Sequence, residues 1–171
     1  MKVGKAIKGL MERTRLTGEQ MAMDLYTSSS NISAMKHSKR NMQRDLAKRS
    51  LEVYEDATYN MEITHEFSNG YTAPVISGDA IDRSNHLAVM VAARKEIDEV
   101  EEVMQLERFL RNPNLATNQE RESAMKVYKE SKEAADILYN LCARLSEAYD
   151  FSPREMNNQV LKKWKATEVV K

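Results

Sequence analysis

The sequence has few turn-forming residues and only one cysteine. Its 171 residues include 5 glycines, 3 prolines and the single Cys142, against 42% hydrophobic and 30% charged residues. This composition favours a mainly α-helical, soluble protein. One cysteine cannot form an internal disulfide, and Cys142 falls on the apolar side of a predicted helix beside Leu138, Leu141 and Leu145. We therefore expect its side chain in the hydrophobic core.

Long hydrophobic runs are also missing. No stretch approaches the roughly 18 to 20 apolar residues that span a bilayer, and residues 1–15 lack an uninterrupted hydrophobic signal region. The sequence therefore predicts a cytoplasmic protein that has no membrane partner.

The residue types that carry catalysis do not form a recognisable group. Cys142 and the three histidines, His37, His65 and His86, lie in separate predicted elements, and no glycine-rich phosphate loop is present. The acidic run 96–102 lies along one predicted helix and lacks the glycine turn of a calcium loop. We expect no enzymatic activity, no cofactor and no metal site.

The charges are unevenly distributed along the chain. In total, 26 basic residues balance 26 acidic ones, which by itself argues against a nucleic-acid-binding protein. However, residues 1–54 carry 11 basic and 5 acidic side chains, whereas residues 55–171 carry 15 basic and 21 acidic ones. Such a division is expected where one half of a protein meets phosphate groups and the other does not. Chance variation of the surface is the alternative.

Four short helices are predicted in residues 1–56. Apolar residues at helical spacing, such as Ile7 and Leu10, place the first over about residues 3–13. The fourth follows the polar stretch 38–42.

The second and third helices have clear start signals. Thr17 and Gln20 fit a capping box, in which each side chain satisfies a backbone amide at the start of a helix. Ser28 is a suitable N-cap for the third helix, whose Ile32 and Met35 face inward. The two helices should meet at a tight turn.

This pair of helices resembles the helix-turn-helix of the phage repressor and Cro family, and the resemblance covers about the first 55 residues. In that family a Leu-Thr pair opens the second helix, an alanine packs where the two helices cross, and an Ile-Ser pair lies in the recognition helix. The corresponding residues here are Leu16-Thr17, Ala22 and Ile32-Ser33. The resemblance implies a domain that binds double-stranded DNA, with the third helix in the major groove. Two packed helices of an ordinary α-helical bundle are the alternative.

The candidate DNA-binding residues are polar side chains of this helix pair and basic ones that follow it. Small hydrogen-bonding groups suit base edges and phosphates, and basic groups neutralise the flanking backbone. The set is Thr17, Gln20, Ser28, Ser29, Ser30, Asn31, Ser33, Lys36, Lys39, Arg40 and Arg44.

The chain departs from the family at two positions that usually hold glycine. Tyr26 occupies the turn between the two helices, and Ser38 follows the recognition helix. Each replacement predicts a strained or altered turn, because glycine adopts left-handed conformations most easily.

A β-hairpin connector is predicted over residues 57–83. From Tyr59 to Phe67, apolar and polar residues alternate with the period of a strand, and Asn69-Gly70 is the preferred hairpin turn. Residues 71–75 would then return as a short edge strand, since Pro74 has no amide donor.

The region 84–171 is predicted to be helical throughout. Two long helices, whose apolar stripes include Leu87 and Met90 in one and Met125 and Tyr128 in the other, should pair as an antiparallel hairpin. A terminal helix begins at the Ser152-Pro153 cap. Its inward-facing residues are expected to be Met156, Val160 and Trp164.

The sequence therefore predicts a transcriptional regulator of phage or bacterial type, repressor-like, that binds operator DNA in a sequence-specific manner. Family members bind palindromic operators as dimers, so a homodimer is expected, assembled through the residues after 56. The alternative is a phage or mobile-element protein whose helical C-terminal half binds and modulates a host protein.

Overall fold

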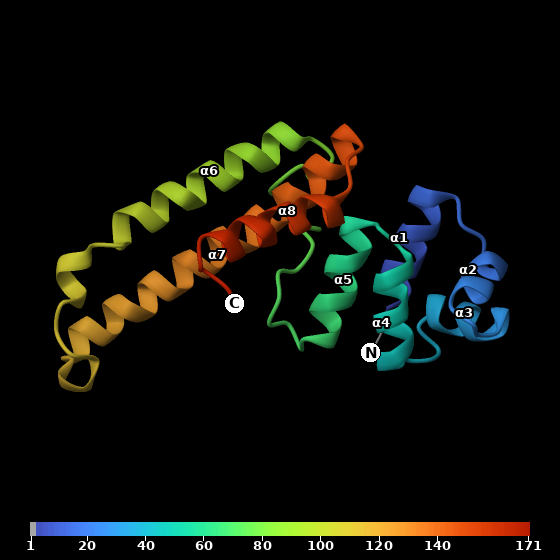
Figure 1. Cartoon of the computed structure of the whole chain (residues 1–171), viewed down its shortest axis with the longest axis horizontal. Helices are drawn as coiled ribbons and strands as arrows, with labels where there is room; N and C mark the ends of the chain where they lie inside the picture. Colours follow the sequence, from blue (N-terminus) through green and yellow to red (C-terminus); the bar gives the residue numbers. More distant parts are fainter. Residues whose placement is uncertain (1–2) are drawn as a thin grey trace. The chain divides into compact units, whose positions relative to one another are not determined.

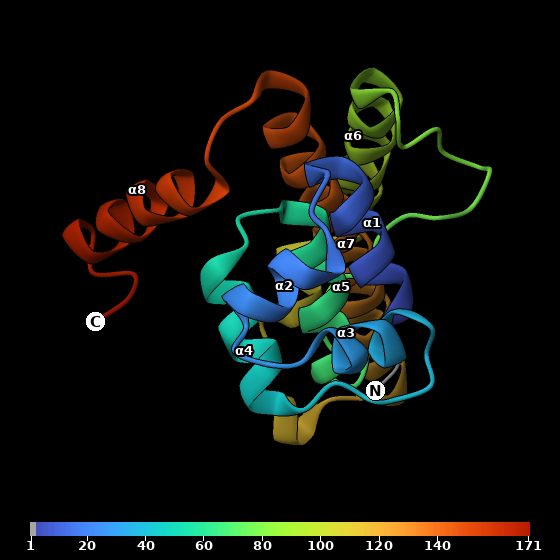
Figure 2. The same cartoon turned by 90° about the vertical axis from the view of Figure 1, so that its right-hand side faces the viewer.

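The computed structural model describes residues 3–171, and all regular structure in that range is helical (Figure 1 and Figure 2). The mainly α-helical class predicted from composition is confirmed. The α-helices are α1 (Gly4–Thr14), α2 (Gly18–Asp24), α3 (Ser29–Lys36), α4 (Arg44–Val53), α5 (Ala57–Phe67), α6 (His86–Val103), α7 (Asn118–Tyr149) and α8 (Pro153–Ala166). Two 3-10 turns, Leu106–Phe109 and Pro113–Leu115, lie between α6 and α7.

The chain divides into two compact units. The first comprises the described residues up to Val75 together with Leu145–Lys171, and the second is Ile76–Arg144. The boundary expected at residue 56 falls inside the first unit, because α5 shares its hydrophobic core. No helix in the described part of the chain is long and apolar enough to cross a membrane.

One hydrophobic core organises α1 to α5 in the first unit. It is built from fully buried side chains of each helix and of the segment before α4. Its members are Val3, Ala6, Ile7, Leu10, Met21, Ala22, Leu25, Ile32, Met35, Met42, Ala47, Tyr59 and Ile63. The four helices predicted before residue 56 are confirmed to within two residues at their starts.

The predicted β-hairpin is wrong, and its first strand is helix α5. Tyr59 and Ile63 are buried at a spacing of four residues, and Phe67, four further on, packs against the same core. A spacing of four fits both a strand face and a helix face, so the alternation did not discriminate. The Asp56 carboxylate decides the outcome locally, since it accepts a hydrogen bond of 2.7 Å from the Tyr59 amide and caps the helix.

The Asn69-Gly70 pair ends α5 instead of making a hairpin turn. Both residues have left-handed backbone angles, with φ of 60° and 80°. The Gly70 amide donates to the His65 carbonyl at 3.0 Å, which closes the helix in a Schellman arrangement. The expected return strand over residues 71–75 has no regular structure.

Within the first unit, the first turn of helix α8 is attached to the end of α4 and the segment after it. The Ser152 hydroxyl and the Arg154 amide both donate to the Glu55 carboxylate, and the Arg154 guanidinium donates to the Glu52 carbonyl at 3.0 Å. The hydrogen bond from Ser152 is the main cause of a lowered pKa for Glu55. Beyond this turn the expected inward face of α8 is exposed at Met156, Val160 and Trp164, so that prediction is wrong.

The second unit is dominated by the antiparallel pair of α6 and the greater part of α7 (Figure 1). Its buried apolar side chains are small ones, namely Val89 and Ala93 on α6 and Ala134 and Ala143 on α7. The buried Asn140 accepts a hydrogen bond of 2.9 Å from the Ile76 amide, which ties the start of the unit to α7.

Candidate nucleic-acid interface

Helix α2 begins with the capping box that its sequence predicts. The Thr17 hydroxyl accepts from the Gln20 amide at 3.1 Å, and the Gln20 side-chain oxygen accepts from the Thr17 amide at 2.9 Å. Both residues are exposed. These bonds engage the Thr17 hydroxyl and the Gln20 oxygen, while the Gln20 side-chain NH2 group remains a donor at the surface.

The two positions that usually hold glycine keep the left-handed backbone that glycine favours. Tyr26 has φ of 52° and Ser38 has φ of 56°. At the end of α2, the Thr27 amide donates to the Ala22 carbonyl at 2.9 Å. The end of α3 is closed in the same way, so both helices terminate in Schellman arrangements. The turn geometry is retained, and the strain of a non-glycine residue is carried at each position.

The turn after α3 lies against the start of α1. A side chain on Gly4 would place its Cβ 2.5 Å from the Ser38 hydroxyl oxygen and 2.7 Å from the Lys36 carbonyl oxygen. Both distances are closer than real Cβ contacts allow, so glycine at this position lets the first helix approach the end of α3. This approach fixes where the basic segment that follows α3 leaves the core.

Helix α3 has one buried side and one exposed side. Ile32 and Met35 are 1% exposed and anchor the helix in the core. The outward residues are small hydroxyl side chains, Ser28, Ser29, Ser30 and Ser33, all exposed. The Ser28 hydroxyl is the N-cap that was predicted, accepting from the Asn31 amide at 3.2 Å. The outer side of α3 thus offers hydroxyl groups without bulky side chains between them.

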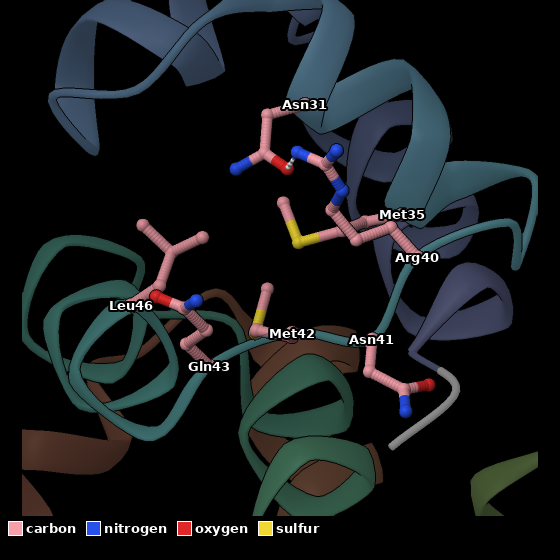
Figure 3. Close-up of a pocket in the computed structure, with 7 residues that line it drawn as sticks. All are labelled: Asn31, Met35, Arg40, Asn41, Met42, Gln43 and Leu46. Carbon is pink, nitrogen blue, oxygen red and sulfur yellow. Dashed lines mark hydrogen bonds between the residues drawn. The ribbon is translucent and has the colours of Figure 1, made fainter.

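Asn31 is engaged on both sides of its amide group. Its NH2 group donates to the Thr27 hydroxyl at 2.9 Å, and its oxygen accepts from the Arg40 guanidinium at 3.0 Å. Figure 3 shows Arg40 reaching across to Asn31 over the thioethers of Met35 and Met42. One lone pair and one N–H of Asn31 remain for other contacts. Asn31 therefore positions Arg40 beside α3, a role that spacing alone did not reveal.

A hollow of about 380 Å³ lies beside this pair. Its lining residues come from the end of α3 and the segment that leads into α4, and are Asn31, Met35, Arg40, Asn41, Met42, Gln43 and Leu46 (Figure 3). The floor is apolar and the rim is polar. Arg40, at this rim, is exposed and its guanidinium is held by Asn31 of α3.

The other basic candidates follow α3 in sequence. Lys36 lies in its last turn and is half-buried, whereas Lys39 and Arg44 are exposed. The Lys39 and Arg40 amides both donate to the Ala34 carbonyl, at 2.8 and 3.2 Å. Folding therefore holds this basic segment at the C-terminal end of α3.

Sequence reasoning missed Arg49, which lies on α4. Its guanidinium stacks over the Tyr26 ring, 3.8 Å from the ring centroid, while Tyr26 itself is 78% exposed. The contact adds a cation–π interaction at the turn between α2 and α3. No local signal connects residues 23 positions apart, so only the fold reveals this pair.

A hydrogen bond ties the end of α2 to the end of α4. The Tyr54 hydroxyl donates to the Asp24 carboxylate at 3.0 Å. Burial, followed by this hydrogen bond, raises the pKa of Tyr54 above its ordinary value.

Within residues 3–171, no group of three or more histidine, cysteine, aspartate or glutamate side chains could hold a metal ion. The candidate residues Ser28 to Arg44 are brought together by α3 and the segment after it, whereas Thr17 and Gln20 lie at the start of α2. Comparison of the chain with protein-family models, with curated proteins and with solved structures found no match.

Proposed function

We propose that the first unit binds double-stranded DNA, with α3 in the major groove and the segment after it on the sugar-phosphate backbone. The observation that carries this proposal is the division of α3 into a core-anchored side, Ile32 and Met35, and an outer side of exposed serine hydroxyls. Hydroxyl groups donate to and accept from base edges and phosphates, and small side chains let a helix approach the groove closely.

The basic side chains support the same orientation. Lys39, Arg40 and Arg44 follow the C-terminal end of α3 directly, and Arg40 is oriented by its hydrogen bond to Asn31. A guanidinium held in one direction loses less conformational entropy when it contacts a phosphate. Arg49, held over Tyr26, adds a further cation at the α2–α3 turn. Phosphate contacts of this kind fix orientation, and α3 supplies sequence selectivity.

The proposed biological role is that of a repressor-like transcriptional regulator that binds an operator as a dimer and acts in the cytoplasm. A single recognition helix contacts few base pairs, and two copies related by a two-fold axis read two half-sites about 34 Å apart. The capture of a host protein by the helical C-terminal half is the second candidate. The exposed apolar side chains of α6, α7 and α8 favour a protein partner of some kind.

Selection of bound duplexes from a random pool by the full chain tests the proposal. We expect an enriched palindromic motif whose half-sites are spaced by about one helical turn. A variant carrying Ser29→Ala, Ser30→Ala and Ser33→Ala is the matched test of α3, because these side chains are exposed and their loss leaves the core intact. It should enrich no motif. Recovery of unselected sequences by the unaltered chain would contradict sequence-specific binding.

A further inference from the structure

The side of α7 that faces outward in the second unit carries a regular stripe of mostly apolar side chains, with Lys132 near its middle. Counting from residue 125, side chains at alternating spacings of three and four lie on one side of the helix. We call these six positions the outer stripe: Met125, Tyr128, Lys132, Ala135, Tyr139 and Cys142. Met125, Tyr128 and Tyr139 are between 63% and 68% exposed, and Cys142 is exposed as well.

A different side of α7 faces the interior of its unit. Ala134 is buried there, and Val127 and Ile137 are partly buried. Helix α7 therefore has two apolar sides, of which the pairing with α6 uses one. The expectations that Met125 and Tyr128 pack inside the helical hairpin, and that Cys142 is a core residue, are wrong for this reason.

We propose that the outer stripe is a dimer interface, formed by antiparallel packing of α7 against α7 of a second copy. The stripe is self-complementary in that direction. A two-fold axis between residues 133 and 134 places Met125 opposite Cys142 of the second copy and Tyr128 opposite its Tyr139. Lys132 then faces the small Ala135, which leaves room for its side chain to keep its ion pair with Asp136.

Charges favour this direction over a parallel one. In a parallel pair, Lys132 faces its own counterpart, and two ammonium groups would be buried together. Lys129 and Asp136 flank the stripe on the same side. In the antiparallel pair, Lys129 of each copy therefore lies opposite Asp136 of the other copy. Opposite charges beside an apolar stripe set the direction and partner of paired helices. A two-fold axis repeats each of these contacts, as an isologous interface requires.

This inference deepens the proposed function, because it names the element that would bring two recognition helices to one operator. That link to DNA rests on the proposed function. The self-association of α7 does not rest on it, because the dimer is measured without DNA. The dimer proposal and the DNA-binding proposal can therefore fail separately.

Cross-linking through the single native cysteine tests the register. In the full chain with Met125→Cys, mild oxidation should give a covalent dimer on a non-reducing gel, because the introduced thiol lies opposite Cys142 of the second copy. The two thiols of one chain cannot join, since 17 residues of helix separate them by about 25 Å and a disulfide needs Cα atoms within about 7 Å. Adding Cys142→Ser to the same chain should abolish the covalent dimer.

Sedimentation of the unaltered chain and of Tyr128→Glu completes the test. We expect a dimer for the former and at least about tenfold weaker association for the latter, because a carboxylate would meet the opposing Tyr139. Tyr71→Glu, at another exposed tyrosine outside α7, should associate normally. Three results would overturn the proposal: a monomer at high concentration, a Tyr128→Glu variant that still dimerises, or a covalent dimer of the unaltered chain through Cys142 alone, which indicates parallel packing.

Discussion

The Arg13 guanidinium donates two hydrogen bonds of 2.7 Å to the Asp56 carboxylate, 43 residues later in the chain. Arg13 lies in the last turn of α1, and Asp56 is the N-cap of α5. One carboxylate therefore caps a helix and joins two helices of the core that supports α3. The side chain of Asp56 is only 10% exposed, so its loss leaves polar groups without partners.

Substitution of Asp56 separates its two roles. Asp56→Ala removes the cap and the partner of Arg13, and we expect it to lower the free energy of unfolding by about 2 to 3 kcal/mol. Asp56→Asn keeps an acceptor for the cap but loses the charge, and should cost about 1 kcal/mol. Urea unfolding of the two full-length variants measures both values. Equal stability of Asp56→Ala and the unaltered chain would show that the interaction contributes little.

The left-handed conformation of Ser38 predicts a stabilising substitution. Ser38→Gly should raise the free energy of unfolding by about 1 kcal/mol, because glycine adopts a φ of 56° without the steric cost of a Cβ. Tyr26→Gly is the control, since it relieves the same strain but removes the stacking of Arg49, and should change stability little. Thermal unfolding compares them. A destabilised Ser38→Gly would mean that the serine makes a contribution larger than the strain.

The contact of Arg40 with Asn31 predicts coupled effects on DNA binding. Arg40→Ala should weaken binding to all duplexes alike, by about 1 kcal/mol, and lower the slope of affinity against salt concentration by about one unit. If Asn31 acts by orienting Arg40, the double variant Asn31→Ala/Arg40→Ala binds no more weakly than Arg40→Ala alone. Titrations on a preferred and a random duplex measure this. An additional loss confined to the preferred duplex would show that Asn31 also reads a base.

Glu96 gives the second unit a pH-dependent stability. One of its carboxylate oxygens is buried without a hydrogen-bond partner. Burial raises the pKa of Glu96 above the ordinary 4.5, and the Glu99, Glu133 and Glu130 carboxylates raise it further, while Lys95 lowers it. Because the pKa of Glu96 is raised in the folded state, its protonated side chain contributes to the stability of the fold. This contribution is fully present below about pH 4.5 and is lost as the pH rises through the folded-state pKa.

Glu96→Gln should therefore have a higher unfolding midpoint than the unaltered chain at pH 7 and the same midpoint at pH 4. Exposed Glu101 lies on the same helix, so Glu101→Gln is a matched control that should show a much smaller difference. Thermal scans at the two pH values measure the effect. A Glu96→Gln variant that is less stable than the unaltered chain at pH 7 would indicate that the fold needs the charged carboxylate.

The sequence predicted those parts of the fold that depend on local signals. The caps at Thr17, Ser28 and Ser152 form between neighbouring residues, and all three were placed correctly. The helix over residues 57–67 was missed because its buried residues recur at a spacing that a strand shares. The choice between the two apolar sides of α7 also escaped prediction, since which side is covered depends on packing and not on hydrophobicity.

The residues of the candidate interface also divide into those that local sequence signals predicted and those that depend on the fold. The outward serines of α3 could be predicted because a helical period and two anchoring residues, Ile32 and Met35, fix the orientation of the helix. The partners of Arg40 and Arg49 could not, because these contacts join side chains 9 and 23 positions apart. Side chains that position a binding group are found only when the turns between helices are known.

Electrophoretic titration of the full chain with duplex DNA at two salt concentrations tests the central proposal most directly. Because cationic side chains that contact phosphates release condensed counterions, affinity should fall steeply between about 50 and 200 mM salt. The combined variant Lys39→Ala/Arg40→Ala/Arg44→Ala should bind more weakly and show a shallower salt dependence. An unaltered chain that binds no duplex at either salt concentration, or binds with an affinity independent of salt, would contradict DNA binding by this surface.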